Sequence, residues 1–252
     1  MQLQELIREL NDTLQPNDIQ DACPNGLQVE GRSEIQKILT GVTACQALLE
    51  VAVEQQVDAI LVHHGYGWRQ QSLTIIGMQR QRLKTLLMHD ISLIAYHLPL
   101  DIHPQLGNNA QLAEILGIQE ASPVSQCQPL GIVWQGELAS PLSGIALAER
   151  IQHRLLRQPL HCDAKQVPLI QSLAWCTGAG QSYITQAAAL GVDAFITGEV
   201  SEPTIHIARE MGLHFYAVGH HASERYGIKA LGEWLKQQHN LSVQFVDIDN
   251  PA

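Results

Sequence analysis

Hydrophobic positions along the chain follow helical and strand-like patterns in turn, which predicts an α/β fold. Residues 3–15 carry leucine and isoleucine at helical spacing, and Pro16 is expected to end that helix. The apolar runs 37–42 and 59–62 are typical of strands, and residues 44–55 between them have the pattern of a helix. A strand, a helix and a strand in this order predict a β-α-β unit with parallel strands.

Further along the chain the hydrophobic pattern predicts more strands and helices, with one segment of different composition between them. We expect a strand at 91–96 and a helix at 108–116, with Asn108 as its N-cap. Residues 122–144 interleave proline, serine and glycine with short strand-like runs, which indicates an antiparallel insertion or the seam between two halves. The β-α pattern resumes at Leu173.

The second half of the chain weakly repeats the first. Residues 39–62 and 176–197 each contain a Thr-Gly pair, a helical pattern and a strand that begins with Asp-Ala. Two β-α units of any α/β protein also look alike, so the repeat is a hypothesis. It predicts two pseudo-symmetric α/β lobes, a first over residues 1–120 and a second over 121–252, packed closely enough to count as one domain.

Composition narrows the class of protein. The 252 residues are 45% hydrophobic, which is enough for a sizeable core, and no window approaches the roughly 18 apolar residues of a membrane span. The five cysteines are scattered and form no C-x-x-C pair, which argues against a disulfide framework and a zinc finger and favours a reducing cytoplasm. A formal net charge of −10 disfavours binding to nucleic acid, although a local basic patch could override it.

Polar residues follow several predicted strands at the point where each ends. In α/β sheets the ligand site lies beyond the carboxyl ends of the strands. Imidazoles and carboxylates together form the ligand set that Zn²⁺, Fe²⁺, Mn²⁺, Ni²⁺ or Co²⁺ prefers, and their number suits two ions about 3.5–4 Å apart. The residues at strand exits are His63, His64, His97, Asp101, Glu199, His220 and Glu224.

Geometry sets conditions on this prediction. Adjacent residues of a regular strand point to opposite faces, so His63 and His64 reach one site only if the strand ends before them, which Gly65 would permit. Glu224 is expected in the first turn of a helix that starts near Ala222, where the helix dipole alone could account for a carboxylate.

The other histidines carry no such pattern. A structural role is predicted for His103, His206, His214 and His221, whereas His89, His153, His161 and His239 are expected in or beside helices. The glycine-rich, aromatic segment 65–68 suits a loop over a site. The basic residues Arg80, Arg82 and Lys84 form either a solvated helix face or an anchor for an anionic substrate.

Six short motifs lie along the chain: Asn25-Gly-Leu-Gln-Val, Val62-His-His-Gly65, His97-Leu-Pro-Leu-Asp101, Leu106-Gly-Asn-Asn109, Thr197-Gly-Glu199 and Gly219-His-His-Ala-Ser-Glu224. Together they resemble the GTP cyclohydrolase I type 2 family, also called NIF-three-like, and especially its bacterial YbgI-like branch. The resemblance covers essentially the whole chain.

The resemblance implies a two-lobed α/β architecture with a dinuclear metal centre between the lobes, and dimers assembled into a hexameric toroid. It implies metal ligands at His63, His64, Asp101, His220 and Glu224. His97 would line the same site as a further ligand or supporting group, and Glu199 would lie nearby; these two are the candidate catalytic residues.

The implied activity is opening of the GTP imidazole ring with release of formate. The sequence contains no P-loop and no G-x-G-x-x-G motif, so a triphosphate would need scattered cations. Candidates are Arg69, Arg80, Arg82, Arg209 and Arg225. Two alternatives stay open because a shared fold does not fix the substrate: a non-catalytic metal-binding protein, and a toroidal scaffold linked to DNA damage resistance.

Overall fold

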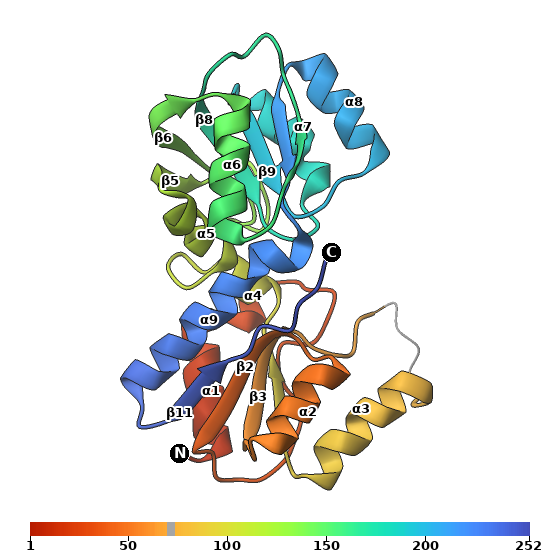
Figure 1. The fold of residues 1–252 in the computed structure, drawn as a ribbon. Helices are drawn as coiled ribbons and strands as arrows, with labels where there is room; N and C mark the ends of the chain where they lie inside the picture. Colours follow the sequence, from red (N-terminus) through yellow and green to blue (C-terminus); the bar gives the residue numbers. More distant parts are fainter. Residues whose placement is uncertain (70–73) are drawn as a thin grey trace. The chain divides into compact units, whose positions relative to one another are not determined.

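The chain forms two compact units in the computed structural model, which describes residues 1–69 and 74–252 (Figure 1). Unit 1 comprises Met1–Leu100 and Ile228–Asp249, and unit 2 comprises Asp101–Gly227 and Asn250–Ala252. The units therefore differ from the continuous lobes expected from the sequence, because the chain returns to the first sheet near its C-terminal end.

Unit 1 contains a sheet of five strands within its described residues, in the order β1-β4-β3-β2-β11. Strands β2, β3, β4 and β11 are parallel to one another, as the β-α-β pattern predicts, and β1 is antiparallel to β4. The strands are β1 (Gly26–Val29), β2 (Lys37–Thr43), β3 (Ala59–His64), β4 (Ser92–Ala95) and β11 (Ser242–Phe245). The helical elements are α1 (Leu3–Leu14), η1 (Pro16–Asp18), α2 (Gln46–Glu54), α3 (Gly77–Met88), α4 (Leu98–Asp101), whose last residue belongs to unit 2, and the later part of α9 (His220–Gln238).

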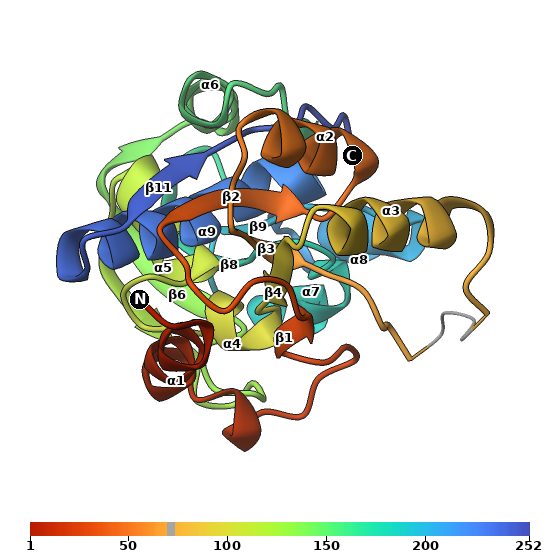
Figure 2. The same cartoon turned by 90° about the horizontal axis from the view of Figure 1, so that it is seen from below.

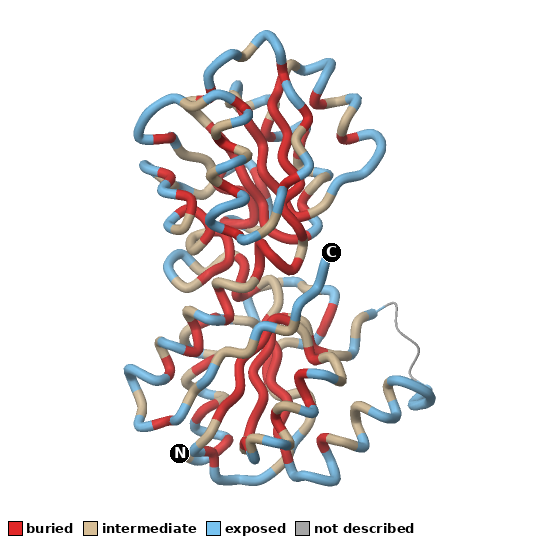
Figure 3. The backbone as a smooth tube through the Cα atoms, in the orientation of Figure 1, coloured by how far each residue is buried: buried red, intermediate tan, exposed pale blue. Residues whose placement is uncertain are grey.

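Helices cover both faces of this sheet. Leu48 of α2 and Leu86 of α3 pack with Leu39 and Ile60 of the strands on one face. On the other face Gly232 of α9 lies close to Thr40 of β2, and Figure 2 shows α1 on this side as well. With both faces covered, the central strands are buried along their length, as Figure 3 shows.

Unit 2 contains a sheet of six strands within its described residues, in the order β5-β6-β8-β9-β10-β7. Strands β8, β9 and β10 are parallel, and β5, β6 and β7 pair with their neighbours in the antiparallel sense. The strands are β5 (Ile118–Pro123), β6 (Trp134–Leu142), β7 (Leu160–Cys162), β8 (Ile170–Cys176), β9 (Ala194–Thr197) and β10 (His214–Ala217). The helical elements are α5 (Asn108–Leu116), α6 (Gly144–Leu155), η2 (Gln181–Tyr183), α7 (Ile184–Ala189), α8 (Glu202–Met211) and the start of α9.

The core of unit 2 lies between this sheet and the helices α5 and α6. Leu112 of α5 and Leu147 of α6 pack with Leu173, Trp175 and Ile196 of the central strands. Figure 1 shows α7 and α8 on the other side of the sheet. The antiparallel pair β5–β6 accounts for the change of composition in the sequence. The parallel β-α-β elements of the two units lie where the weak repeat predicts them.

Across residues 1–69 and 74–252, no helix combines the length and the apolar character that a membrane span requires.

Candidate metal centre

Three histidines of unit 1 gather at the carboxyl end of its parallel strands. The ring centroids of His63 and His64 lie 4.5 Å apart, and one ring nitrogen of each lies within 4.8 Å of one from His97. The expectation that the strand ends before this pair was wrong, because β3 runs to His64, which pairs with Thr43. The two rings nevertheless lie close together at the end of β3, where His63 and His64 are the last two residues.

Hydrogen bonds orient the first two rings. His63 is fully buried, and its Nδ1 lies 3.0 Å from the carbonyl oxygen of Tyr96. A carbonyl oxygen only accepts, so Nδ1 carries the proton and Nε2 of the neutral ring carries the lone pair. Metal-binding histidines characteristically use one nitrogen in this way. His64 Nδ1 lies 3.2 Å from the hydroxyl of Thr43.

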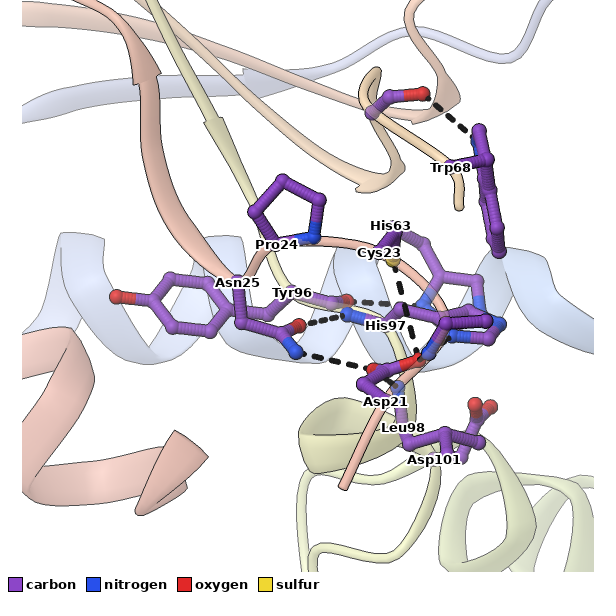
Figure 4. Close-up of polar contacts among 12 residues, drawn as sticks. Asp21, Cys23, Pro24, Asn25, His63, Trp68, Tyr96, His97, Leu98 and Asp101 are labelled. Atoms are coloured by element: carbon purple, nitrogen blue, oxygen red, sulfur yellow. Dashed lines mark hydrogen bonds and ion pairs between the residues drawn. The ribbon is translucent and has the colours of Figure 1, made fainter. Parts of the chain in front are cut away.

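Asp21 holds the third ring, and the sequence did not predict this residue. His97 Nδ1 lies 2.8 Å from Asp21 Oδ1, while Asn25 and the backbone amide of Leu98 donate to Asp21 Oδ2 (Figure 4). Burial raises the pKa of the Asp21 carboxyl, but the hydrogen bonds from His97 and Asn25 outweigh it and hold that pKa well below 3.8. His97 is therefore positioned by an ionised carboxylate.

The segment after β3 covers this histidine group. The ring centroid of Trp68 lies 4.9 Å from that of His97 and 5.9 Å from that of His64. The Trp68 indole N–H donates to the carbonyl of Gly65 at 3.2 Å, which fixes the loop. The predicted aromatic loop therefore lies over the histidines of unit 1, and their role as a site stays a prediction.

In unit 2, one imidazole lies between two carboxylates. His220 Nδ1 lies 2.7 Å from Glu199 Oε1, and His220 Nε2 lies 3.1 Å from Glu224 Oε2. Burial lowers the pKa of His220, but the hydrogen bonds and negative charges of Glu224 and Glu199 outweigh it and raise the pKa to about 9. The expected helix start near Ala222 was wrong: α9 begins at His220, so Glu224 lies one turn beyond the helix start and faces that imidazole.

Asp101 brings a second buried carboxylate close to Glu224. The two side chains are 4% and 3% exposed as residues, and a carboxylate oxygen of one lies within 4.8 Å of one of the other. Asn108 donates to Asp101 Oδ1 at 2.8 Å, and its own Oδ1 accepts from the Gly227 amide. The prediction that Asn108 is the N-cap of α5 was wrong, because Gly107 is the N-cap. The Asn108 side chain orients Asp101 instead.

Buried carboxylates so close together favour a cation beside them, because two like charges removed from water destabilise each other. The structure thus brings the predicted residues together in two groups, each within one unit. Unit 1 provides His63, His64 and His97, and unit 2 provides Asp101, Glu199, His220 and Glu224. Ring nitrogens and carboxylate oxygens in these groups suit transition-metal ions.

Some of the remaining predicted residues have structural partners instead. His103 Nδ1 accepts the backbone amide of Leu106, which agrees with a structural role. Arg82 lies over the ring of Tyr66 at 6.0 Å, and Arg225 donates to the carbonyl of Leu155.

The match to known proteins covers the whole fold described above. The model of the Duf34/NIF3 (NGG1p interacting factor 3) family matches residues 1–251. The chain belongs to this family. Among its relatives, the GTP cyclohydrolase 1 type 2 homolog of Yersinia pestis is 59% identical over 248 residues, which are 98% of each protein.

Solved structures of other proteins have the same fold. A structure described as protein ybgI, of unknown function, is 56% identical over all of both chains, with a TM-score of 0.95. The crystal structure of a Thermus thermophilus protein, TTHA1606, is 32% identical over all of both chains, with a TM-score of 0.91. The family resemblance and the α/β fold predicted from the sequence are confirmed, whereas the roles of individual site residues stay predictions.

Proposed function

We propose that this chain is a metal-dependent hydrolase with a centre of two divalent transition-metal ions. The observation that carries the proposal is the pair of buried carboxylates, Asp101 and Glu224, beside the imidazole of His220. The ligands proposed are His63, His64, Asp101, His220 and Glu224.

The donor set of each unit fits such ions. In unit 2 the positive charge that the raised pKa keeps on His220 offsets part of the charge of two carboxylates, and a divalent cation would replace that proton and offset more. In unit 1, His63 Nδ1 donates its hydrogen bond to the carbonyl of Tyr96, so the lone pair of Nε2 is the one that can bind an ion. Nitrogen and oxygen donors together suit Fe, Zn, Mn, Ni or Co. That the two donor sets share one centre is inferred from the family resemblance.

The bound ions would supply Lewis acidity that activates water and polarises a substrate oxygen. The protein's own residues would position and move protons around them. Asp21 fixes His97 through Nδ1, so that Nε2 of the same ring can take or give a proton. Glu199 orients His220 in the same way through Nδ1. These two contacts are the evidence for the roles proposed for His97, which would take or give a proton, and for Glu199, which would orient His220.

The substrate proposed is a purine nucleotide, with GTP as the named candidate and opening of its imidazole ring with formate release as the reaction. The support is the description of the relatives as GTP cyclohydrolase 1 type 2 homologs. The same donors would equally serve a non-catalytic metal-binding protein, which would hold metal and turn over no purine. The hexameric toroid and a role on DNA stay predictions of the family resemblance.

Elemental analysis of the purified full chain, followed by a formate-release assay with GTP and the metal found, tests the proposal. The expected result is about two equivalents of transition metal per chain with formate released. His63→Ala and Glu224→Ala should each lose metal and formate release, and the exposed His206→Ala should lose neither. Metal without formate would leave the non-catalytic alternative, and full metal content in both site variants would contradict the ligand assignment.

A further inference from the structure

A second cluster of metal-binding residue types lies at the edge of the unit 2 sheet, apart from the groups described above. His161 Nε2 lies 3.0 Å from His214 Nδ1, and Asp163 Oδ1 lies 3.6 Å from the same His214 nitrogen. One ligand atom from each of the three side chains lies within 4.8 Å of the others. The expectation that His161 falls in or beside a helix was wrong, because it lies in β7, which pairs with β10 and so brings it to His214.

The backbone fixes which nitrogen of His214 carries the lone pair. His214 Nε2 lies 2.8 Å from the carbonyl oxygen of Val167, so this nitrogen must donate. In the neutral ring the lone pair is therefore on Nδ1, which faces His161 and Asp163 and accepts a hydrogen bond from the backbone amide of Ala164 at 3.4 Å. Histidines that bind metal commonly donate their other ring N–H to a backbone carbonyl.

The two imidazoles also have little freedom to turn away. The ring of His161 stacks parallel on Tyr216, with centroids 4.5 Å apart, and the Tyr216 hydroxyl donates to the carbonyl of Gly144. His214 is 1% exposed. A Cβ atom at Gly144 would lie 2.7 Å from a ring carbon of each histidine, so the start of α6 confines both rings. Ligands held in place before an ion arrives lose little entropy when they bind it.

We propose that His161, Asp163 and His214 bind one divalent transition-metal ion, at a site separate from the centre proposed above. Two ring nitrogens and one carboxylate oxygen suit Zn²⁺, Co²⁺ or Ni²⁺ and not Mg²⁺ or Ca²⁺, which take oxygen ligands. When the ion binds, the proton in the 3.0 Å contact between the two nitrogens moves from Nε2 to Nδ1 of His161, which leaves the Nε2 lone pair for the ion. The Asp163 side chain is 57% exposed, which gives the ion a path from solvent and leaves a coordination position for water.

The structural consequence concerns the edge of the sheet. Strand β7 has only three residues, and among the described residues it lies at the edge of the sheet beside β10. An ion shared by His161 of β7 and His214 of β10 fastens this short edge strand, and the chain up to Val167, to the sheet. The proposed ion would stabilise the fold at this edge, and its ligands are not ligands of the proposed hydrolase centre.

Zinc binding by the metal-free full chain tests this inference, with Zn²⁺ as the only ligand added. After equilibrium dialysis, Asp163→Asn and His161→Gln should each hold about one equivalent of zinc less than the wild type. The matched control is His206→Gln, which removes an exposed histidine of the same unit that also pairs with a carboxylate, Glu202 at 3.0 Å. It should bind as much zinc as the wild type. Because the Asp163 side chain is exposed, its variant keeps the test valid if the histidine variant folds poorly.

A spectroscopic readout separates this site from the proposed hydrolase centre. In a His63→Ala background, Zn²⁺ should shift the ¹⁵N resonances of His161 Nε2 and His214 Nδ1 in long-range imidazole spectra, and Asp163→Asn should weaken that response. The inference would be overturned if all variants held the same amount of zinc, or if the ¹⁵N shifts of His161 and His214 did not change when zinc was added. Either result would leave the proposal for the other centre untouched.

Discussion

His97 and Asp21 form a partly buried imidazole–carboxylate pair, with Nδ1 and Oδ1 2.8 Å apart, although 76 positions separate them in the sequence. The carboxylate also accepts from Asn25 and from the backbone amide of Leu98, so its position is fixed from three sides. An ionised carboxylate that holds one ring nitrogen fixes the orientation of the His97 ring.

Asp21→Asn is expected to weaken metal binding about 10- to 100-fold, the usual effect of removing a group that supports a metal-site histidine. The amide keeps the shape but loses the charge that orients His97. Competition with a chromogenic chelator measures the affinity. Asp18→Asn, an exposed acid in the preceding 3₁₀ turn, is the matched control and should bind like the wild type. Equal affinity in the two variants would exclude this role for Asp21.

The same pair predicts a pH dependence of stability. The folded pKa of Asp21 is lowered, so its contribution to the free energy of unfolding is present above pH 3.8 and is lost as the pH falls towards the folded value. The difference in unfolding free energy between the wild type and Asp21→Asn should therefore be largest at neutral pH and shrink in acid. Urea unfolding at pH 7 and pH 3 measures it. A difference that does not change with pH would show that the carboxylate charge contributes nothing.

His220 predicts that metal uptake releases a proton. Its pKa of about 9 in the metal-free chain means that the ring is charged at neutral pH, so an ion must displace that proton. Metal affinity should then fall about tenfold for each pH unit below 9, down to the range where other ligands also protonate. Glu199→Gln should lower the pKa of His220 and flatten this dependence between pH 7 and pH 9. An unchanged slope would mean that Glu199 does not set the charge of His220.

In the absence of metal the same proton stabilises the fold. Because the folded pKa of His220 is raised, its contribution is fully present below 6.5 and is lost as the pH rises through about 9. Unfolding of the metal-free chain between pH 6 and pH 10 should show this loss in the wild type, and a smaller loss in Glu199→Gln.

Gly178 tests how tightly Glu224 is held. Its φ of +63° is unfavourable for other residues, and a Cβ atom there would overlap Glu224 Oε1 and approach His220 Nε2 at 3.3 Å. Gly191 has a similar φ of +73° with nothing within 4 Å of an added Cβ, so Gly191→Ala isolates the backbone strain, about 1–2 kcal/mol. Gly178→Ala should lose at least as much stability and also lose metal. Metal content equal to that of Gly191→Ala would show that Glu224 can move without consequence.

The sequence predicted elements and residues that depend on local pattern. The parallel β-α-β units follow from apolar runs separated by helical periodicity, and the contact between His220 and Glu224 follows from a spacing of four residues on one helix. Strand-exit positions identified His63, His64 and His97 because parallel strands end at one edge of a sheet.

What the sequence did not predict depends on contacts between distant segments. Asp21 precedes β1 in an irregular stretch, so no periodicity links it to His97. His161 and His214 meet only because a three-residue strand pairs with β10, and a strand so short leaves no alternating pattern to recognise. The return of the chain to the first sheet through β11 is likewise a tertiary contact, with Val243 opposite Ile38.

The most direct test of the proposed hydrolase centre is the metal content of Asp101→Asn/Glu224→Gln, a double variant that removes both buried charges and keeps the size of each side chain. The wild type and the double variant should be loaded with the same ion, dialysed and compared by elemental analysis. The double variant is expected to lose about two equivalents of divalent metal per chain while its circular dichroism stays that of the wild type. A variant that folds normally and keeps all of its metal would show that Asp101 and Glu224 do not hold the ions.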